Sequence, residues 1–206
     1  MLRVHRIPFS TNVERVALAA GAKGIEVVWV DHDPADRAQL RDLSGQGLVP
    51  VAEIDGEVIF DSMRIVERLE ALEPEPALYP ADPAERARLD VFVEWFNLVW
   101  KGPPNELDEA LAEGEPDPAT AEDLIARTRA WTPIFESMLT GRPFLTGDAF
   151  GAADVCAFPF LKYAVARTLD EDDESFHRVL ETCLKPADAY PLLRDWVGRV
   201  DALPRA

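Results

Sequence analysis

The sequence predicts an α/β domain followed by an all-α domain. Extended and helical patterns alternate over the first 72 or so residues, and only helical patterns follow after residue 83. Four prolines between residues 74 and 83 separate the two regions and are typical of a linker. At 206 residues the chain is long enough for two small cores. We therefore expect domains at residues 1–76 and 84–206, joined by a linker at residues 77–83.

The first domain begins with a strand–helix–strand pattern. Apolar and polar residues alternate from Leu2 to Ile7, which is typical of a strand. Helical spacing follows from Val13, and two glycines end that helix. A second strand is expected at residues 25–30, so the two strands should be parallel. A short helical stretch is expected next, at residues 34–43.

Residues 48–62 complete the first domain. Pro50 cannot donate to a sheet ladder, so it belongs at the entry to a strand. Asp55 and Gly56 lie between two apolar runs, and this pair predicts a β-hairpin. A helical pattern then begins at Ser62, with Asp61 or Ser62 as its N-cap. Free N–H groups at that helix start favour a ligand carboxylate.

The second domain is expected to contain long helices with defined breaks. Asp82 and Pro83 predict the start of a helix that Gly102, Pro103 and Pro104 kink or break. Another helix is expected at residues 119–139, with a possible bend at Pro133.

An apolar helix is expected after residue 151. Asp154 stands three residues after Gly151, and this spacing predicts a capping box in which glycine replaces the usual hydroxyl. That replacement costs only a few tenths of a kcal/mol, so the helix should survive. An acidic surface loop at residues 169–175 and helices at 176–184 and 190–203 complete the chain.

Composition excludes several classes of function. The net charge of −17 disfavours nucleic acid and anionic lipid as partners. No apolar run approaches the roughly 20 residues of a membrane span, and the N-terminus lacks the apolar core of a signal peptide, so we expect a cytoplasmic protein. Cys156 and Cys183 form no CxxC or zinc pattern, and the three histidines show no metal-ligand spacing. We expect Cys156 to be an inert buried thiol, and no metal site.

The ordered set of motifs resembles the glutathione transferases over nearly the whole chain. In that family a thioredoxin-like domain carries a cis-proline, a hairpin and an acidic–Ser pair, which match Pro50 and Asp61–Ser62 here. The helical domain of the family carries a Gly-Asp and Ala-Asp pattern, which Gly147–Asp148 and Ala153–Asp154 match. Gly151 departs from the family's Ser or Thr. The resemblance implies glutathione as co-substrate, a small hydrophobic electrophile, a detoxification role and a homodimer.

A hydroxyl is the candidate catalytic group. The head of the first helix, where a thioredoxin-like oxidoreductase needs a thiolate, contains no cysteine. A hydroxyl there can instead hydrogen-bond to the sulfur of bound glutathione and favour its thiolate, which then attacks the electrophile. Ser10 is the best match to the serine-type, bacterial-like members of the family, with Thr11 and Asn12 as rivals.

The resemblance assigns further residues to glutathione. The backbone at Val49, before Pro50, would pair with the cysteinyl part, and Asp61 and Ser62 would hold the γ-glutamyl end. Arg37 is expected at the glycine carboxylate, with Gln39 and Arg41 as alternatives. The electrophile groove is expected beside three aromatic residues, Phe9, Phe96 and Trp100.

Two other functions remain open at this stage. One is a non-catalytic binding or regulatory protein on the same fold, without turnover. The other is a cysteine-based reductase, which the missing cysteine disfavours and which would require Cys156 or Cys183 to be reactive in the folded state.

Overall fold

The computed structural model describes residues 2–114, 116–165, 172, 174–185 and 187–206. The chain forms two compact units. The N-terminal unit comprises Met1–Tyr79 together with Leu203–Ala206, and the helical unit comprises Pro80–Ala202. The division falls inside the stretch expected to be a linker. The last four residues pack with the N-terminal unit, although the sequence-based boundary placed them with the helices.

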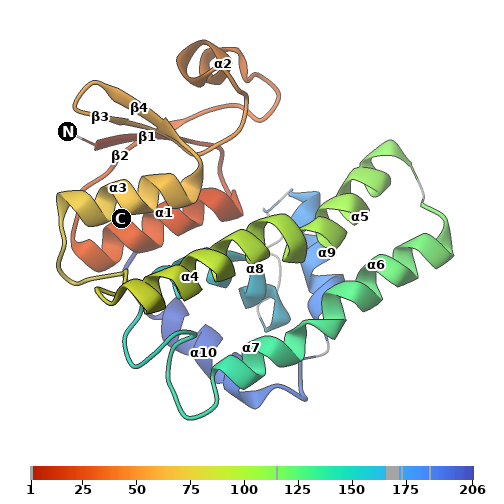
Figure 1. The fold of residues 1–206 in the computed structure, drawn as a ribbon. Coiled ribbons are helices and arrows are strands. Elements are labelled where there is room, and N and C mark those ends of the chain that lie inside the picture. The colour runs from red at the N-terminus through yellow and green to blue at the C-terminus, as the bar shows by residue number, and fades with distance from the viewer. Residues whose placement is uncertain (1, 115, 166–171, 173, 186) are drawn as a thin grey trace. The chain divides into compact units, whose positions relative to one another are not determined.

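The N-terminal unit is built on a four-stranded sheet with the order β2-β1-β3-β4 (Figure 1). β1 pairs in parallel with β2 and antiparallel with β3, and β4 pairs antiparallel with β3. The parallel β1–β2 pair confirms the strand–helix–strand prediction. The four strands are β1 (Leu2–Arg6), β2 (Val28–Asp31), β3 (Val51–Ile54) and β4 (Glu57–Phe60).

β2 begins three residues later than the sequence predicts. Gly24 adopts a left-handed conformation, with φ of 65°, and caps the preceding helix. The N–H of Ile25 donates to the carbonyl of Ala20 at 2.9 Å, so the helix end uses a group that a strand ladder would need. The apolar residues that follow Gly24 therefore enter the sheet only at Val28.

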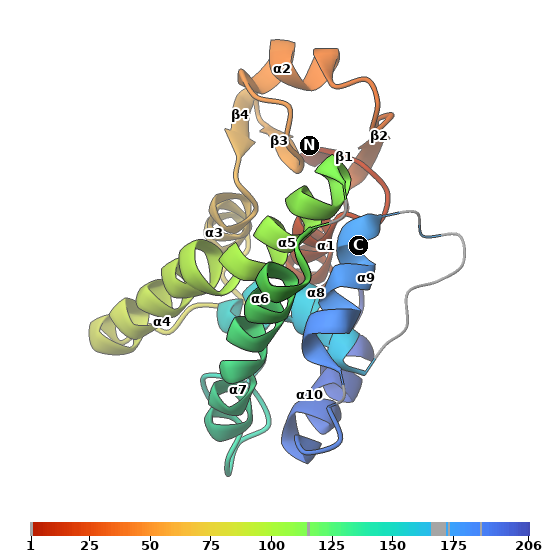
Figure 2. The ribbon, with the colours of Figure 1, turned by 90° about the vertical axis from the view of Figure 1, so that its right-hand side faces the viewer.

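Three helices cover the sheet. α1 (Thr11–Lys23) and α3 (Ser62–Leu72) pack against each other on one face, and α2 (Ala38–Ser44) lies on the other (Figures 1 and 2). α2 begins later than expected because the carboxylates of Asp33 and Asp36 accept the N–H groups of Ala35 and Ala38, and these bonds hold the chain in turns. This β-α-β-α-β-β-α order is the thioredoxin-like arrangement.

The hairpin and its following helix form as predicted. Asp55 and Gly56 have φ of 51° and 89°, and positive φ at both central positions is what a two-residue type I′ turn requires. Asp61 is the N-cap of α3, since its Oδ1 accepts the N–H groups of Met63 and Arg64 at 2.9 and 3.2 Å.

The helical unit follows the expected breaks. Asp82 caps its first helix, and a π-helical turn at Phe96–Trp100 precedes Pro103 and Pro104, which cannot donate to the turn before them. The second long helix breaks between Ala130 and Thr132. The helices are α4 (Pro83–Trp95), α5 (Gly102–Glu113), α6 (Pro118–Ala130), α7 (Thr132–Met138), α8 (Ala152–Leu161), α9 (Ser175–Leu184) and α10 (Pro191–Asp201).

α8 is the core helix of this unit, and all ten of its residues are buried. Asp154 completes the predicted capping box by accepting the N–H of Gly151 at 3.0 Å. It also accepts the N–H of Leu145 and the indole N–H of Trp196, at 3.0 and 2.7 Å. Both cysteines are buried, as expected for Cys156, and burial raises the pKa of Cys183.

The structure describes only three residues of the predicted acidic loop, Asp172, Glu174 and Ser175. Most of the acidic loop predicted at residues 169–175 lies outside the described residues. Among the residues that the structure describes, no helix has the length and apolar character needed to cross a membrane. The same residues contain no group of three or more His, Cys, Asp or Glu side chains arranged to hold a metal ion.

Candidate functional site

Strand register brings the predicted site residues to one end of the sheet. β1 ends at Arg6 and leads into the turn that carries Ser10. His5 pairs with Val51, and Val51 pairs with Phe60 on its other side. Pro50, just before β3, and Asp61, just after β4, therefore lie at the same end of the sheet as the turn after β1.

Ser10 is the N-cap of α1, but its side chain makes no capping hydrogen bond. Its backbone is extended, with φ of −60° and ψ of 121°, and its carbonyl accepts the N–H of Glu14 at 3.0 Å. The residue is half-buried. The hydroxyl thus stands at the positive end of the α1 dipole without being used to cap the helix.

The two rivals of Ser10 are placed differently. Thr11 is buried, with 6% of its surface exposed. Asn12 accepts a hydrogen bond from Arg15, with 3.2 Å between Asn12 Oδ1 and Arg15 Nη1. Ser10 therefore differs from Thr11 in being half-buried, and from Asn12 in carrying a hydroxyl rather than an amide that is bonded to Arg15.

Phe9 precedes Ser10 in an uncommon conformation. Its φ is 64°, a left-handed value that costs a non-glycine residue about 1–2 kcal/mol. The ring is 42% exposed, so burial of the side chain does not offset this cost. Strain of this kind concentrates at ligand sites, and here it falls on the residue directly before the candidate hydroxyl.

The proline loop has the geometry that the resemblance implies. The peptide bond between Val49 and Pro50 is cis. Pro50 is buried and Val49 is half-buried. The backbone at Val49 is thus carried to the sheet end where β1 turns into α1.

Arg15 joins the starts of α1 and α3. Its side chain is 1% exposed, and Nη1 donates to Asn12 Oδ1 at 3.2 Å and to Ser62 Oγ at 3.1 Å. Arg15 was not among the residues expected at the site. A signal was present, because Arg15 shares its helical face with the buried residues Thr11, Leu18 and Ala19.

Arg37 is held by the backbone near α2. Its Nε donates to the carbonyl of Pro34 and its Nη1 to the carbonyl of Gly47, both at 3.1 Å. Gln39 and Arg41, the alternatives, are exposed. Arg37 therefore braces the two ends of the α2 segment, and a role toward a carboxylate stays a prediction.

Phe96 and Trp100 do not line an open surface. Both are fully buried, and their rings stack with centroids 4.5 Å apart. Phe135 and Phe160 pack edge-on against them. Aromatic residues at helical spacing have here formed the core of the helical unit, so their expected place in an electrophile groove is wrong.

A polar chain that the sequence analysis missed lies on the sheet. His5 Nδ1 is 2.8 Å from His32 Nε2, and His5 Nε2 is 3.0 Å from Glu53 Oε1. Burial, together with His5, lowers the pKa of His32, and the hydrogen bond from His5 is the main cause of a lowered pKa for Glu53. The three residues are far apart in the sequence, and only strand pairing brings them together.

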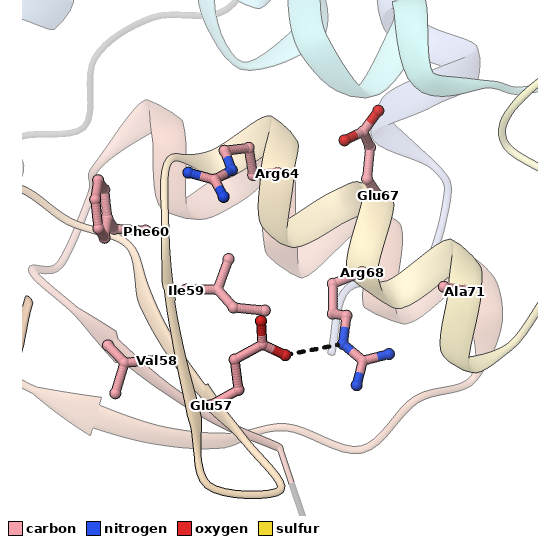
Figure 3. A pocket seen from close by; sticks show the side chains of 8 residues that line it. All are labelled: Glu57, Val58, Ile59, Phe60, Arg64, Glu67, Arg68 and Ala71. Carbon is pink, nitrogen blue, oxygen red and sulfur yellow. Dashed lines mark ion pairs between the residues drawn. The ribbon is translucent and has the colours of Figure 1, made fainter.

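A groove of 320 Å³ lies along the sheet edge, between β4 and α3 (Figure 3). Ile59 points from β4 toward α3, whereas Val58 and Phe60, which are 38% and 41% exposed, lie on the other side of the strand (Figure 3). Glu57 and Arg68 form an ion pair of 3.6 Å across it, and Arg64 lies over the Phe60 ring at 6.0 Å. The groove therefore carries charged side chains of both signs, and the exposed apolar side chains lie on the other side of β4.

Known protein families match both units. Residues 4–77 match the family model described as glutathione S-transferase, N-terminal domain, and residues 118–199 match the corresponding C-terminal domain model. A Rattus norvegicus protein named maleylacetoacetate isomerase is 30% identical over 155 residues, which is 70% of this chain and 69% of the relative.

Two further comparisons agree. A Drosophila melanogaster protein named "Probable maleylacetoacetate isomerase 1" is 31% identical over 165 residues, 73% of this chain. The match spans 63% of that relative, less than two thirds of its length. The crystal structure of a theta class enzyme from Xanthomonas axonopodis pv. citri, with glutathione bound, superposes with a TM-score of 0.72 at 25% identity. That match covers 96% of this chain and 91% of the other.

Proposed function

Because the chain belongs to the glutathione S-transferase family, we propose that it binds glutathione in its N-terminal unit and activates the thiol with Ser10. The observation that carries this proposal is the Ser10 hydroxyl itself. It stands at the start of α1, half-buried, and makes no bond to the helix that it caps. An O–H in this place donates to a ligand sulfur while the helix dipole favours the negative charge.

The free energy of one hydrogen bond is comparable to the free energy needed to lower the pKa of the glutathione thiol. A free thiol has a pKa of about 8.5, and each unit of depression requires about 1.4 kcal/mol. A hydrogen bond to a charged group contributes about 1.5–3 kcal/mol, which lowers the thiol pKa by about one to two units. The resulting thiol pKa of about 6.5 to 7.5 leaves roughly a quarter to three quarters of the bound thiol ionised at neutral pH. The thiolate attacks a small electrophile beside the exposed ring of Phe9.

Two outcomes of that attack are consistent with the relatives. In conjugation, the sulfur–carbon bond persists and glutathione is consumed. In isomerisation of an electron-poor cis alkene such as maleylacetoacetate, the thiolate adds to one alkene carbon and the former double bond rotates. The thiolate then leaves as the double bond reforms in the trans geometry, so glutathione is regenerated. Measuring glutathione consumption against product formation separates the two.

The remaining contacts to glutathione follow the predicted assignments. The backbone at Val49, held by the cis bond to Pro50, pairs with the cysteinyl part. Asp61 and Ser62, at the start of α3, hold the γ-glutamyl end, where an anion also gains from the helix dipole. Arg37 lies in the segment that would approach the glycine carboxylate.

We also propose that the functional form is a homodimer that uses the groove between β4 and α3. Val58 and Phe60 supply exposed apolar side chains on the edge strand β4, and Glu57, Arg64 and Arg68 supply charges of both signs near the same strand (Figure 3). A patch with both signs is self-complementary across a two-fold axis, even though the chain as a whole carries −17. Light scattering should report a dimer for the wild-type protein and a monomer for Val58→Lys.

The test of the enzymatic proposal combines calorimetry with kinetics. Wild-type protein should bind glutathione and accelerate its reaction with at least one member of a panel of electrophiles. Ser10→Ala should keep glutathione affinity but lose about tenfold to a hundredfold in rate at neutral pH. Ser137→Ala, at an exposed serine of α7 that has no place in the proposed site, is the matched control. Undiminished turnover in Ser10→Ala would remove Ser10 from the mechanism. Glutathione binding without acceleration of any electrophile would instead favour a binding or regulatory protein.

A further inference from the structure

We propose that Arg15 is a positioning residue that turns Ser62 and Asn12 into outward hydrogen-bond donors for the γ-glutamyl carboxylate of glutathione. This inference rests on the proposed function. It adds a residue that does not itself touch the ligand, and it concerns the start of α3 rather than the chemistry at Ser10.

Arg15 is a charged residue in a buried position. Its side chain is among the largest fully buried ones, at 1% exposure, and extends from α1 to Ser62 at the start of α3. Taking a guanidinium out of water is costly unless its hydrogen bonds are satisfied. Nη1 meets two neutral oxygens, Asn12 Oδ1 at 3.2 Å and Ser62 Oγ at 3.1 Å.

These two bonds fix the direction of their partners. A guanidinium only donates, so both partners must accept from it. The Ser62 oxygen therefore faces Arg15, and its own O–H is directed away. Asn12 must likewise turn its carbonyl oxygen to Arg15, which directs its amide N–H groups elsewhere. Because its oxygen accepts from Arg15, each of the two side chains, Ser62 and Asn12, is left with N–H or O–H groups that donate in other directions.

The start of α3 makes Ser62 the available group. Asp61 satisfies three N–H groups there: its carboxylate accepts from Met63 and Arg64, and its carbonyl accepts from Ile65. Ser62 is the first helical residue, so its N–H has no acceptor within α3, and its O–H is the one that Arg15 orients. Ser62 therefore offers an N–H and an O–H together, which suits the two oxygens of a carboxylate.

The positive charge of Arg15 also offsets the negative charge of the protein near the proposed carboxylate site. The protein carries −17 overall, and Asp61 places a carboxylate next to the site. An anionic ligand is repelled by this field unless a cation offsets it locally. Arg15 supplies that positive charge one hydroxyl away from the ligand, in a buried place where salt screens it little.

The test compares two ligands on four proteins. The ligands are glutathione and an analogue whose γ-glutamyl α-carboxylate is replaced by hydrogen. Wild-type protein should prefer glutathione by at least about tenfold, as expected for a charge-assisted contact. Arg15→Met should lose most of that preference, and Arg15→Lys should restore part of it. Arg6→Met, which removes an arginine paired with Asp31 in the same unit, should keep the wild-type preference.

Kinetics separates positioning from a general structural role. Arg15→Met should raise KM for glutathione while kcat at saturation changes little, because Ser10 is untouched. If Arg15→Met does not fold, Arg15→Lys and Ser62→Ala carry the test, and Ser62→Ala should lower the preference about tenfold. A full wild-type preference in the folded Arg15 and Ser62 variants would overturn the inference while leaving the proposed function intact. Failure of the wild-type protein to bind glutathione would overturn both.

Discussion

Asp154 should give the helical unit a pH-dependent stability of an unusual sign. Asp154 lies in the first turn of α8, and burial of its carboxylate raises its pKa from 3.8 to about 6. Four donors oppose the shift without cancelling it, namely the N–H groups of Leu145, Gly151 and Asp154 itself and the indole of Trp196. Most structural carboxylates have lowered pKa values, and their proteins lose stability in acid.

The sign and size follow from linkage. Between pH 4 and 6 the folded state keeps a proton on Asp154 that the unfolded chain releases, so stability falls as pH rises through this window. The raised pKa is about two units above the ordinary value, which corresponds to about 3 kcal/mol lost by pH 7. Asp154→Asn removes this dependence but turns an amide N–H₂ toward the Gly151 N–H, which costs roughly 1–3 kcal/mol at low pH.

Urea unfolding followed by tryptophan fluorescence, at a series of pH values from about 4 to 7, measures this term. The stability difference between wild type and Asp154→Asn should favour wild type most at low pH and shrink as pH rises. Asp148→Asn, at an exposed carboxylate in the segment before α8, is the control and should follow the wild-type curve. A difference that is constant across the range would refute the assigned burial effect.

Three further predictions concern the N-terminal unit. Phe9→Gly should be about 1 kcal/mol more stable than Phe9→Ala in urea unfolding, because only glycine adopts the observed φ freely, and both variants should bind apolar electrophiles more weakly with unchanged glutathione affinity. Burial lowers the pKa of His32 below 6.5, so the unfolded chain binds its proton more readily; stability should fall as pH drops below 6.5, and His32→Gln should flatten this fall. Lys23→Met should cost roughly 3–5 kcal/mol, because Nζ pairs with Glu70 at 2.6 Å and donates to the carbonyls of Glu73 and Pro76.

Local rules accounted for the parts of the fold that depend on neighbouring residues. The Asp55–Gly56 hairpin, the Asp82 cap and the Gly151–Asp154 box each depend on bonds within a few residues, and all three formed. The late start of β2 depends on a bond from Ile25 back to Ala20, which a pattern of apolar residues does not reveal.

The candidate site also combines features that depend on neighbouring residues with contacts between residues far apart in the sequence. The start of the first helix and its lack of cysteine are local features, and the family resemblance then singled out Ser10, whose role stays a prediction. The pairing of His5 with His32 and of Arg15 with Ser62 spans 27 and 47 residues, so these contacts appear only once the strands and helices are assembled. Phe96 and Trp100 were misplaced because the same helical spacing serves a core and a ligand groove.

A crystal structure of the protein with glutathione tests the central claim most directly. The proposal predicts the tripeptide at the sheet end formed by β1, β3 and β4, with its sulfur within hydrogen-bonding distance of Ser10 Oγ. A sulfur that lies out of reach of the Ser10 side chain, or a tripeptide bound away from the N-terminal unit, would contradict the account.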